Sequence, residues 1–167
     1  MTQQEIEQRV EKAKALFKQG FNCSQAVFAA CADLYGIEDE SLALRLAASF
    51  GGGIGRMRQT CGAACGMFML AGLENGSATP HDAEGKMQNY ALVQDMAGRF
   101  REINGSIICK ELLGLVPMGS SQPVQKESPE PSDRTAEYYK KRPCEELVGI
   151  SARIVGEKIL CHTQNVK

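Results

Sequence analysis

Residues 60–73 read Thr-Cys-Gly-Ala-Ala-Cys-Gly-Met-Phe-Met-Leu-Ala-Gly-Leu, a run of small or apolar side chains. The run predicts a helix from Cys61 to about Leu73, with Thr60 as its N-cap. Glycine and alanine make this helix slim, so that the backbone of a second helix can approach it closely. A slim apolar helix of this kind is typical of the interior of a helical bundle.

The sequence on both sides of this run predicts further helices. Ile6, Val10, Ala13 and Phe17 recur at three- and four-residue intervals between Glu5 and Lys18, and no stretch alternates with period two. The other predicted helices cover residues 22–36 (capped by Asn22), 39–50, 79–103 (opened by Thr79-Pro80), 106–114 (capped by Ser106), a short piece at Tyr138-Tyr139, and 143–160. We therefore expect an all-α fold, a compact bundle of about six to seven helices.

Composition predicts one domain over residues 1–167, built from aliphatic side chains. The chain has 167 residues, 43% of them hydrophobic, only 6% aromatic and none of them Trp. This length suits a single core. Residues 115–132 hold four prolines among Ser, Gln and Glu, and we expect a long flexible surface loop there, within the domain.

The charge balance argues against nucleic acid and membrane surfaces as partners. Nineteen Lys and Arg face twenty Asp and Glu, giving a formal net charge of −1, so no excess of positive charge is available for phosphate backbones or acidic lipids. The chain starts without a basic segment followed by an apolar run, and no stretch approaches the ~20 apolar residues of a spanning helix. We expect a cytoplasmic protein.

The seven cysteines are the main chemical signal. An odd number without an export signal argues against a disulfide framework. Four of them fall in the first turn of a predicted helix, where unpaired amides and the helix dipole favour the thiolate: Cys23, Cys61, Cys109 and Cys144. We expect Cys31 and Cys161 to be buried fillers. Cys65, four residues after Cys61 and so on the same helix face, is a resolving thiol, a spare ligand or a small core residue.

Several segments together carry a resemblance to a known family. Gly20–Val27 (GFNCSQAV), Phe50–Gly55 (FGGGIG) and Cys61–Gly66 (CGAACG), followed by Cys109 and Cys144, resemble the redox-active family named for the pattern C_GCAxxG_C_C. The resemblance implies that its four characteristic cysteines are the four selected above and that they serve redox chemistry. A related domain occurs in a split-Soret cytochrome with an iron–sulfur centre, but this chain has no Cys-x-x-Cys-His, so haem attachment is not expected.

A set of four thiolates suits Zn²⁺ or an iron–sulfur cluster. Successive members lie 38, 48 and 35 residues apart, unlike the close ligand pairs of zinc ribbons and ferredoxins, so any such site must be assembled by the tertiary fold. Our first hypothesis is a metal centre on these four cysteines, an iron–sulfur cluster for electron transfer with a redox partner protein. Zinc and the absence of any metal are the alternatives.

Two other functions stay open. In a thiol–disulfide oxidoreductase, Cys61 would be the catalytic nucleophile and Cys65 or Cys23 the resolving thiol. The positive charges of Arg56 and Arg58 would then raise the electrostatic potential at Cys61, which favours its thiolate, although exposed arginines are more often simply solvated. In a noncatalytic binding module the cysteines would be core residues, and the slim helix would serve packing or a homodimer. Whether the protein is an enzyme depends on which chemistry it uses.

The remaining polar signals are weak. The glycine run at Gly51–Gly55 departs from G-x-G-x-x-G and follows a predicted helix, so a nucleotide loop is not expected; a loop that lets Cys61 approach other sulfurs is the better interpretation. His81 and His162 are expected on the surface. Lys140-Lys141-Arg142 is expected to be a solvated helix end.

Overall fold

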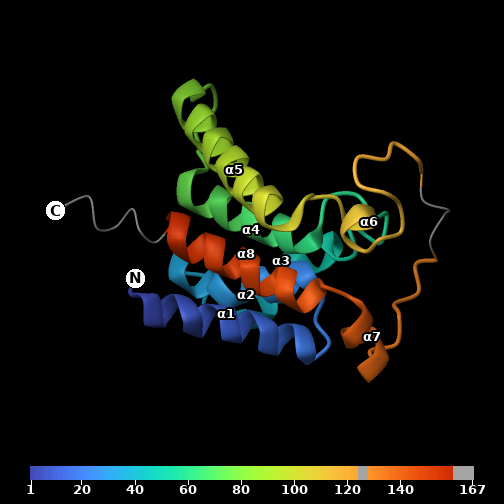
Figure 1. Cartoon of the computed structure of the whole chain (residues 1–167). Helices are drawn as coiled ribbons and strands as arrows, with labels where there is room; N and C mark the ends of the chain where they lie inside the picture. The colour runs from blue at the N-terminus through green and yellow to red at the C-terminus, as the bar shows by residue number, and fades with distance from the viewer. Residues whose placement is uncertain (124–127, 160–167) are drawn as a thin grey trace.

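The computed structural model describes residues 1–123 and 128–159, and it confirms the all-α fold (Figure 1). Its α-helices are α1 (Gln3–Lys18), α2 (Cys23–Cys31), α3 (Glu40–Ala47), α4 (Gly62–Asn75), α5 (Ala83–Asn104), α6 (Cys109–Leu112), α7 (Ala136–Lys141) and α8 (Cys144–Ile159). Two 3₁₀ helices, η1 (Ala32–Tyr35) and η2 (Ala48–Phe50), extend α2 and α3. The described part of the chain thus has eight α-helices where about six to seven were predicted, and α6 and α7 are only four and six residues long.

Helix α8 lies across the middle of the bundle, with α1 and α2 on one side and α4 and α5 on the other (Figure 1). It buries Leu147, Val148 and Ile154. Opposite them, α4 buries Met67 and Leu70. Because the aliphatic face of α8 touches four other helices, the C-terminal helix completes the core that the earlier helices begin.

The close approach predicted for the slim helix is present between α2 and α4. A Cβ atom at Gly66 would lie 2.7 Å from the carbonyl oxygen of Ser24 and 3.0 Å from the Cβ of Val27. Real Cβ atoms essentially never come within 3.0 Å of such an atom. Glycine at position 66 therefore sets how near α2 lies to α4.

Helix starts agree with the sequence at α2 and α3 and differ at α4. Asn22 caps α2, and with Gln25 it forms a complete capping box. Thr60 is not the cap of α4, because it pairs with Ile108 in an antiparallel bridge and leaves Cys61 at the N-cap. Tertiary pairing has replaced the local capping preference there.

The predicted starts of α5 and α6 are also wrong by two or three residues. Helix α5 begins at Ala83 because the side chain of Asp82 accepts a hydrogen bond from the amide of Gly85 at 2.9 Å, so Thr79-Pro80 lies before the helix. The hydroxyl of Ser106 accepts from the amide of Ile108 at 2.9 Å and does not cap α6, which starts at Cys109. A side-chain cap therefore decides the start of α5, whereas α6 starts at Cys109 without one.

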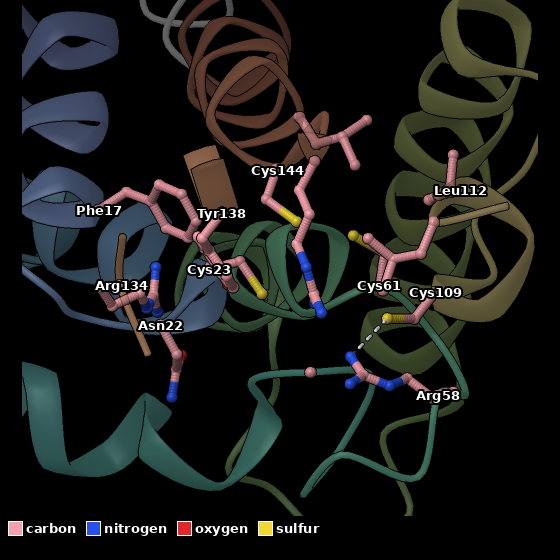
Figure 2. Close-up of a pocket in the computed structure, with 14 residues that line it drawn as sticks. Phe17, Asn22, Cys23, Arg58, Cys61, Cys109, Leu112, Arg134, Tyr138 and Cys144 are labelled. Atoms are coloured by element: carbon pink, nitrogen blue, oxygen red, sulfur yellow. Dashed lines mark hydrogen bonds between the residues drawn. The ribbon is translucent and has the colours of Figure 1, made fainter. Parts of the chain in front are cut away.

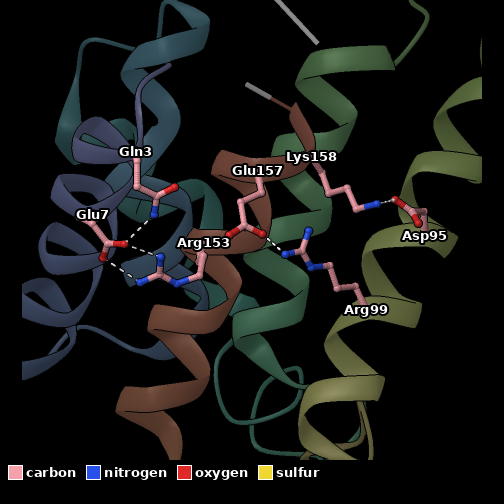
Figure 3. A network of polar contacts seen from close by, with 7 residues as sticks. All are labelled: Gln3, Glu7, Asp95, Arg99, Arg153, Glu157 and Lys158. Atoms are coloured by element: carbon pink, nitrogen blue, oxygen red, sulfur yellow. Dashed lines mark hydrogen bonds and ion pairs between the residues drawn. The ribbon is translucent and has the colours of Figure 1, made fainter. Parts of the chain in front are cut away.

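Ion pairs tie α8 to its neighbours on both sides (Figure 3). Arg153 of α8 forms a two-pronged contact with Glu7 of α1, with Nη2 and Oε2 2.7 Å apart. Lys158 reaches Asp95 of α5 at 2.7 Å, and Arg99 of α5 pairs with Glu157. These contacts are partly exposed, so they set the registry of the helices more than they add to stability.

The outer part of the molecule consists of the first half of α5 and the segment between α6 and α7. In α5 only Met96, Ala97 and Phe100 are buried, all in its second half. Residues 113–123 lead away from α6 and residues 128–135 lead into α7 (Figure 1), and Arg56 donates from Nε to the carbonyl of Ser128 at 3.0 Å. No helix in the described residues is both long and apolar enough to span a membrane.

Candidate functional site

The four selected cysteines line one pocket at the end of the bundle where α2, α4, α6 and α8 begin (Figure 2). Cys23, Cys109 and Cys144 are the first residues of α2, α6 and α8, and Cys61 is the N-cap of α4. The pocket encloses about 50 Å³, which is room for more than one water-sized group. The fold therefore brings together residues that are far apart in the chain.

Glycines make room for the sulfur atoms. A Cβ at Gly62 would lie 2.5 Å from the Sγ of Cys23, so that sulfur rests directly on the first residue of α4. A Cβ at Gly53, where φ is +73°, would lie 2.6 Å from the Cβ of Cys109. The glycine loop thus packs on Cys109, whereas the sequence suggested that it would serve Cys61.

A short antiparallel pairing fixes two of the cysteines. The amide of Cys61 donates to the carbonyl of Ile107 at 2.8 Å, and the amide of Cys109 donates to the carbonyl of Gln59 at 2.7 Å. These bonds hold the starts of α4 and α6 side by side. Cys61 and Cys109 are both buried, at 5% and 7% exposure, so their environment is set by the protein and not by solvent.

Burial raises the pKa of three of these thiols. Desolvation is the largest cause for Cys61, Cys109 and Cys144, and it brings the pKa of Cys144 to about 12. Negative charge on Cys23 would raise the pKa of each of them further. The backbone amides of Ala63 and Ala64, at the start of α4, act in the opposite direction and lower the pKa of Cys61. The rise in pKa caused by burial is thus larger than the fall caused by the helix N-terminus.

Arg58 enters the pocket as a buried cation. It is only 3% exposed, and its Nη1 donates to the Sγ of Cys109 at 3.9 Å (Figure 2). This contact lowers the pKa of Cys109 against the effect of burial. The expectation of a solvated arginine is wrong for Arg58, and its sulfur partner is Cys109 where the sequence suggested Cys61.

Two more arginines line the pocket: Arg134, which the sequence analysis did not consider, and Arg142, which it placed on a solvated helix end. The guanidinium of Arg134 lies over the rings of Phe17 and Tyr138, 4.7 and 4.8 Å from their centroids, and donates to the carbonyl of Phe21. The guanidinium of Arg142 also lies over the ring of Tyr138, 4.7 Å from its centroid. Both line the thiol pocket, so the solvated helix end predicted at 140–142 is wrong for Arg142. Arg134 lies before α7 (Ala136–Lys141) and Arg142 at its extended C-cap, so no helical spacing in the sequence predicts their meeting.

Cys65 lies apart from the four. It lines a different pocket, with Phe68 and Ile107, and its Sγ points to the carbonyl of Thr60 at 3.8 Å. Because Cys61 has the extended backbone of an N-cap (φ −53°, ψ 131°), the four-residue helix rule does not align the two side chains. Burial raises the pKa of Cys65 to about 11.

The other described candidate residues, Cys31 and His81, do not line the pocket. Cys31 is fully buried, as predicted, and burial raises its pKa to about 12. His81 is exposed. Cys161 and His162 lie outside the described residues.

The donor set and the charge of the pocket suit a metal–thiolate centre. Four thiols line it together with three guanidinium groups, and a group ligated by four thiolates carries net negative charge that arginine can offset. Among the residues that the structure describes, however, no three His, Cys, Asp or Glu side chains are gathered so as to hold a single metal ion.

Comparison with known proteins gives one match. The family described as "Putative redox-active protein (C_GCAxxG_C_C)" matches residues 21–158, a range that includes all four pocket cysteines. No curated protein and no solved structure matches the chain.

Proposed function

The chain belongs to the C_GCAxxG_C_C family, and from this we propose that its pocket thiols hold an iron–sulfur cluster for electron transfer. The residues that would hold it are Cys23, Cys61, Cys109 and Cys144. The observation that carries the proposal is that these four line one arginine-rich pocket. When bound, such a cluster accepts one electron from a donor and passes it to a partner protein.

The raised pKa values of the pocket cysteines favour metal ligation over reactions of their free thiols. A nucleophilic cysteine needs a thiolate at neutral pH, which a lowered pKa provides. Burial instead raises the pKa of Cys61, Cys109 and Cys144. A bound metal displaces the thiol proton itself, so ligation does not require a low pKa in the metal-free protein.

One side chain beside the thiols suits a bound cluster. The buried guanidinium of Arg58, at the Sγ of Cys109, would act as a hydrogen-bond donor that tunes the reduction potential.

A second candidate function is thiol–disulfide exchange between Cys61 and Cys23. One observation favours it, namely the contact of the Cys23 sulfur with Gly62, the neighbour of Cys61. The thiolate of Cys61 would attack a substrate disulfide and release one substrate thiol, and Cys23 would then displace the second as a Cys23–Cys61 disulfide forms. Cys65 fits the resolving role less well, because it lines another pocket.

Metal and sulfide analysis tests the proposal. Protein purified without oxygen and without chelators is assayed for iron, zinc and acid-labile sulfide, and its visible spectrum is recorded. We expect stoichiometric iron with sulfide and a brown colour. Serine at any one of the four pocket positions should lower the iron content, whereas Cys65→Ser and Cys31→Ala, which change thiols outside the pocket, should keep it.

Three results would contradict the cluster. Zinc without iron indicates a single-ion site. A metal-free protein in which Cys61→Ser abolishes one fast thiol reaction indicates exchange chemistry. A metal-free protein that tolerates all four serine substitutions indicates a noncatalytic binding module.

A further inference from the structure

Residues 134–142, which we call the strap, form one wall of the thiol pocket. The strap is α7 with the residues that flank it, and three of its side chains line the pocket: Arg134, Tyr138 and Arg142. Figure 2 shows Arg134 and Tyr138 together on the side of the pocket where Phe17 and Cys23 lie. No strap residue is fully buried, and none belongs to the buried core of the described chain. The strap therefore covers the thiols without holding the bundle together.

The strap is attached near the C-terminal end of α1 through side-chain contacts. The hydroxyl of Tyr139 donates to the carbonyl of Lys18 at 3.3 Å, and its ring meets that of Phe17 edge-on, with the centroids 5.8 Å apart. The guanidinium of Arg134 lies over the same Phe17 ring and donates to the carbonyl of Phe21 at 3.2 Å. Contacts of these kinds are individually weak. A few of them therefore decide whether the strap stays closed.

The chain can bend at both ends of the strap. Arg142 has an extended backbone (φ −114°, ψ 135°) and separates α7 from α8, because the residue before a proline is disfavoured in a helix. At the other end, residues 128–131 are exposed. Residues at the ends of elements are the usual hinges of such movements. The strap can therefore move as a unit while α8 stays in the core.

The strap carries positive charge toward the thiols. Burial is the largest influence on the pKa of Cys144 and raises it, whereas the charges of Arg142 and Arg134 lower it. The Nη1 of Arg134 is also buried and has no hydrogen-bond partner in the described part of the chain, and an unpaired buried donor is costly. Thiolates ligated to a metal group carry negative charge, so they hold the strap closed more firmly than neutral thiols do.

We propose that the strap swings open to admit the group that the pocket thiols bind, and then closes over it. Cys23 and Cys144 are the two pocket thiols that are not fully buried, so opening of the strap uncovers these two first. The identity of the admitted group rests on the proposed function. The movement of the strap does not, because the accessibility of the thiols measures it without any metal.

Alkylation of the metal-free full chain with iodoacetamide tests the movement. Peptide mass spectrometry follows the rates at Cys23 and Cys144 at one fixed pH, and the fully buried Cys31 reports global unfolding. Tyr139→Leu loosens the strap without changing a charge or a residue that lines the thiol pocket. We expect Cys23 and Cys144 to react about fivefold faster or more, since an aromatic pair and a hydrogen bond are lost. Tyr90→Leu, at an exposed tyrosine of α5, is the matched control and should leave the rates unchanged.

Release of iron to a chelator tests the link between the strap and the bound group. The iron-loaded Tyr139→Leu chain should lose its iron about fivefold faster or more, for the same loss of contacts, and Tyr90→Leu should lose it at the unchanged rate. Iron release that is not faster in Tyr139→Leu, although its thiols alkylate faster, would overturn admission through the strap. A chain that binds no iron refutes the proposed function, whereas the alkylation rates still test the strap.

The alkylation rates also decide against the strap in two cases. Unchanged rates at Cys23 and Cys144 in Tyr139→Leu would overturn the proposal, and so would an equal rise at Cys31, because the whole bundle would then be opening. Arg134→Lys is a second variant, which keeps the charge beside the thiols and removes the planar group over Phe17. It should act in the same direction, and far-ultraviolet circular dichroism checks that each variant is folded.

Discussion

Replacement of Gly62 by alanine should damage the thiol pocket and the fold together. The added Cβ would lie 2.5 Å from the Sγ of Cys23, 2.8 Å from the carbonyl oxygen of Phe50 and 3.2 Å from the Cα of Gly51, where ordinary contacts are 3.4–4 Å. Cys23 can rotate away, but the two backbone atoms cannot. Relief of the clash therefore moves either η2 or the start of α4.

The size of the effect follows from two opposing contributions. Overpacking in a close-packed site costs about 1–3 kcal/mol, and alanine in place of glycine in a helix returns about 0.5–1 kcal/mol. We expect a net loss of about 1–2 kcal/mol in the free energy of unfolding, measured by urea denaturation. Under the proposed function we also expect less iron per folded protein, because the Cys23 sulfur has been displaced.

The same helix provides two matched controls. A Cβ at Gly72 has no atom within 4 Å, so Gly72→Ala should stabilise the protein by about 0.5–1 kcal/mol and keep its iron. A Cβ at Gly66 meets the carbonyl of Ser24 at 2.7 Å but no pocket thiol, so Gly66→Ala should destabilise the protein and keep the iron of the folded fraction. If Gly62→Ala were as stable as the unchanged protein and bound as much iron, the packing argument for the pocket would be refuted.

Three further predictions concern the helix cap, an ion pair and the buried arginine. Asn22→Ala removes the cap of α2 and should lower the free energy of unfolding by about 0.5–2 kcal/mol in urea melts; an unchanged midpoint would show that the cap does not hold α2. Hydrogen bonding to Arg153 lowers the pKa of Glu7 from 4.5 to about 2, so its stabilising contribution is complete above pH 4.5 and is lost as the pH falls toward 2. Glu7→Gln should accordingly flatten the decline of stability between these pH values, and an equally steep decline would contradict the assignment. Arg58→Gln removes the contact that lowers the pKa of Cys109, so alkylation of Cys109 in iron-free protein should shift to higher pH, whereas an unchanged profile would mean that the contact has no influence.

The parts of the fold that sequence reasoning predicted are those with local causes. The apolar spacing from Ile6 to Phe17 gives α1, and Asn22 with Gln25 gives the start of α2. The cysteine pattern is local in the same sense, because each of the four cysteines begins or caps a helix. Their meeting in one pocket required only that those helix starts lie at the same end of the bundle.

The parts that sequence reasoning missed depend on distant partners. Thr60 would cap a helix in isolation, but its pairing with Ile108 takes it out of that role. From the sequence, Arg58 is expected to be an exposed loop residue. Its burial against Cys109 follows from the position of α6. The stacking of Arg134 on Phe17 joins residues 117 positions apart, and no periodicity in either segment predicts that contact.

The exposed residues after α6 offer a place where the chain could be cut into two fragments. Residues 117–119 and 121–123 are exposed, and the fully buried apolar residues that the structure describes after them belong to α8, which carries Cys144 and the buried Leu147, Val148 and Ile154. A cut after Ser121 leaves one piece with three of the pocket cysteines and a second piece with the fourth. Neither piece alone can complete the core or the sulfur set. We expect the two, made separately, to recombine on mixing, and under iron–sulfur reconstitution the colour of a cluster would then report complementation of the two fragments.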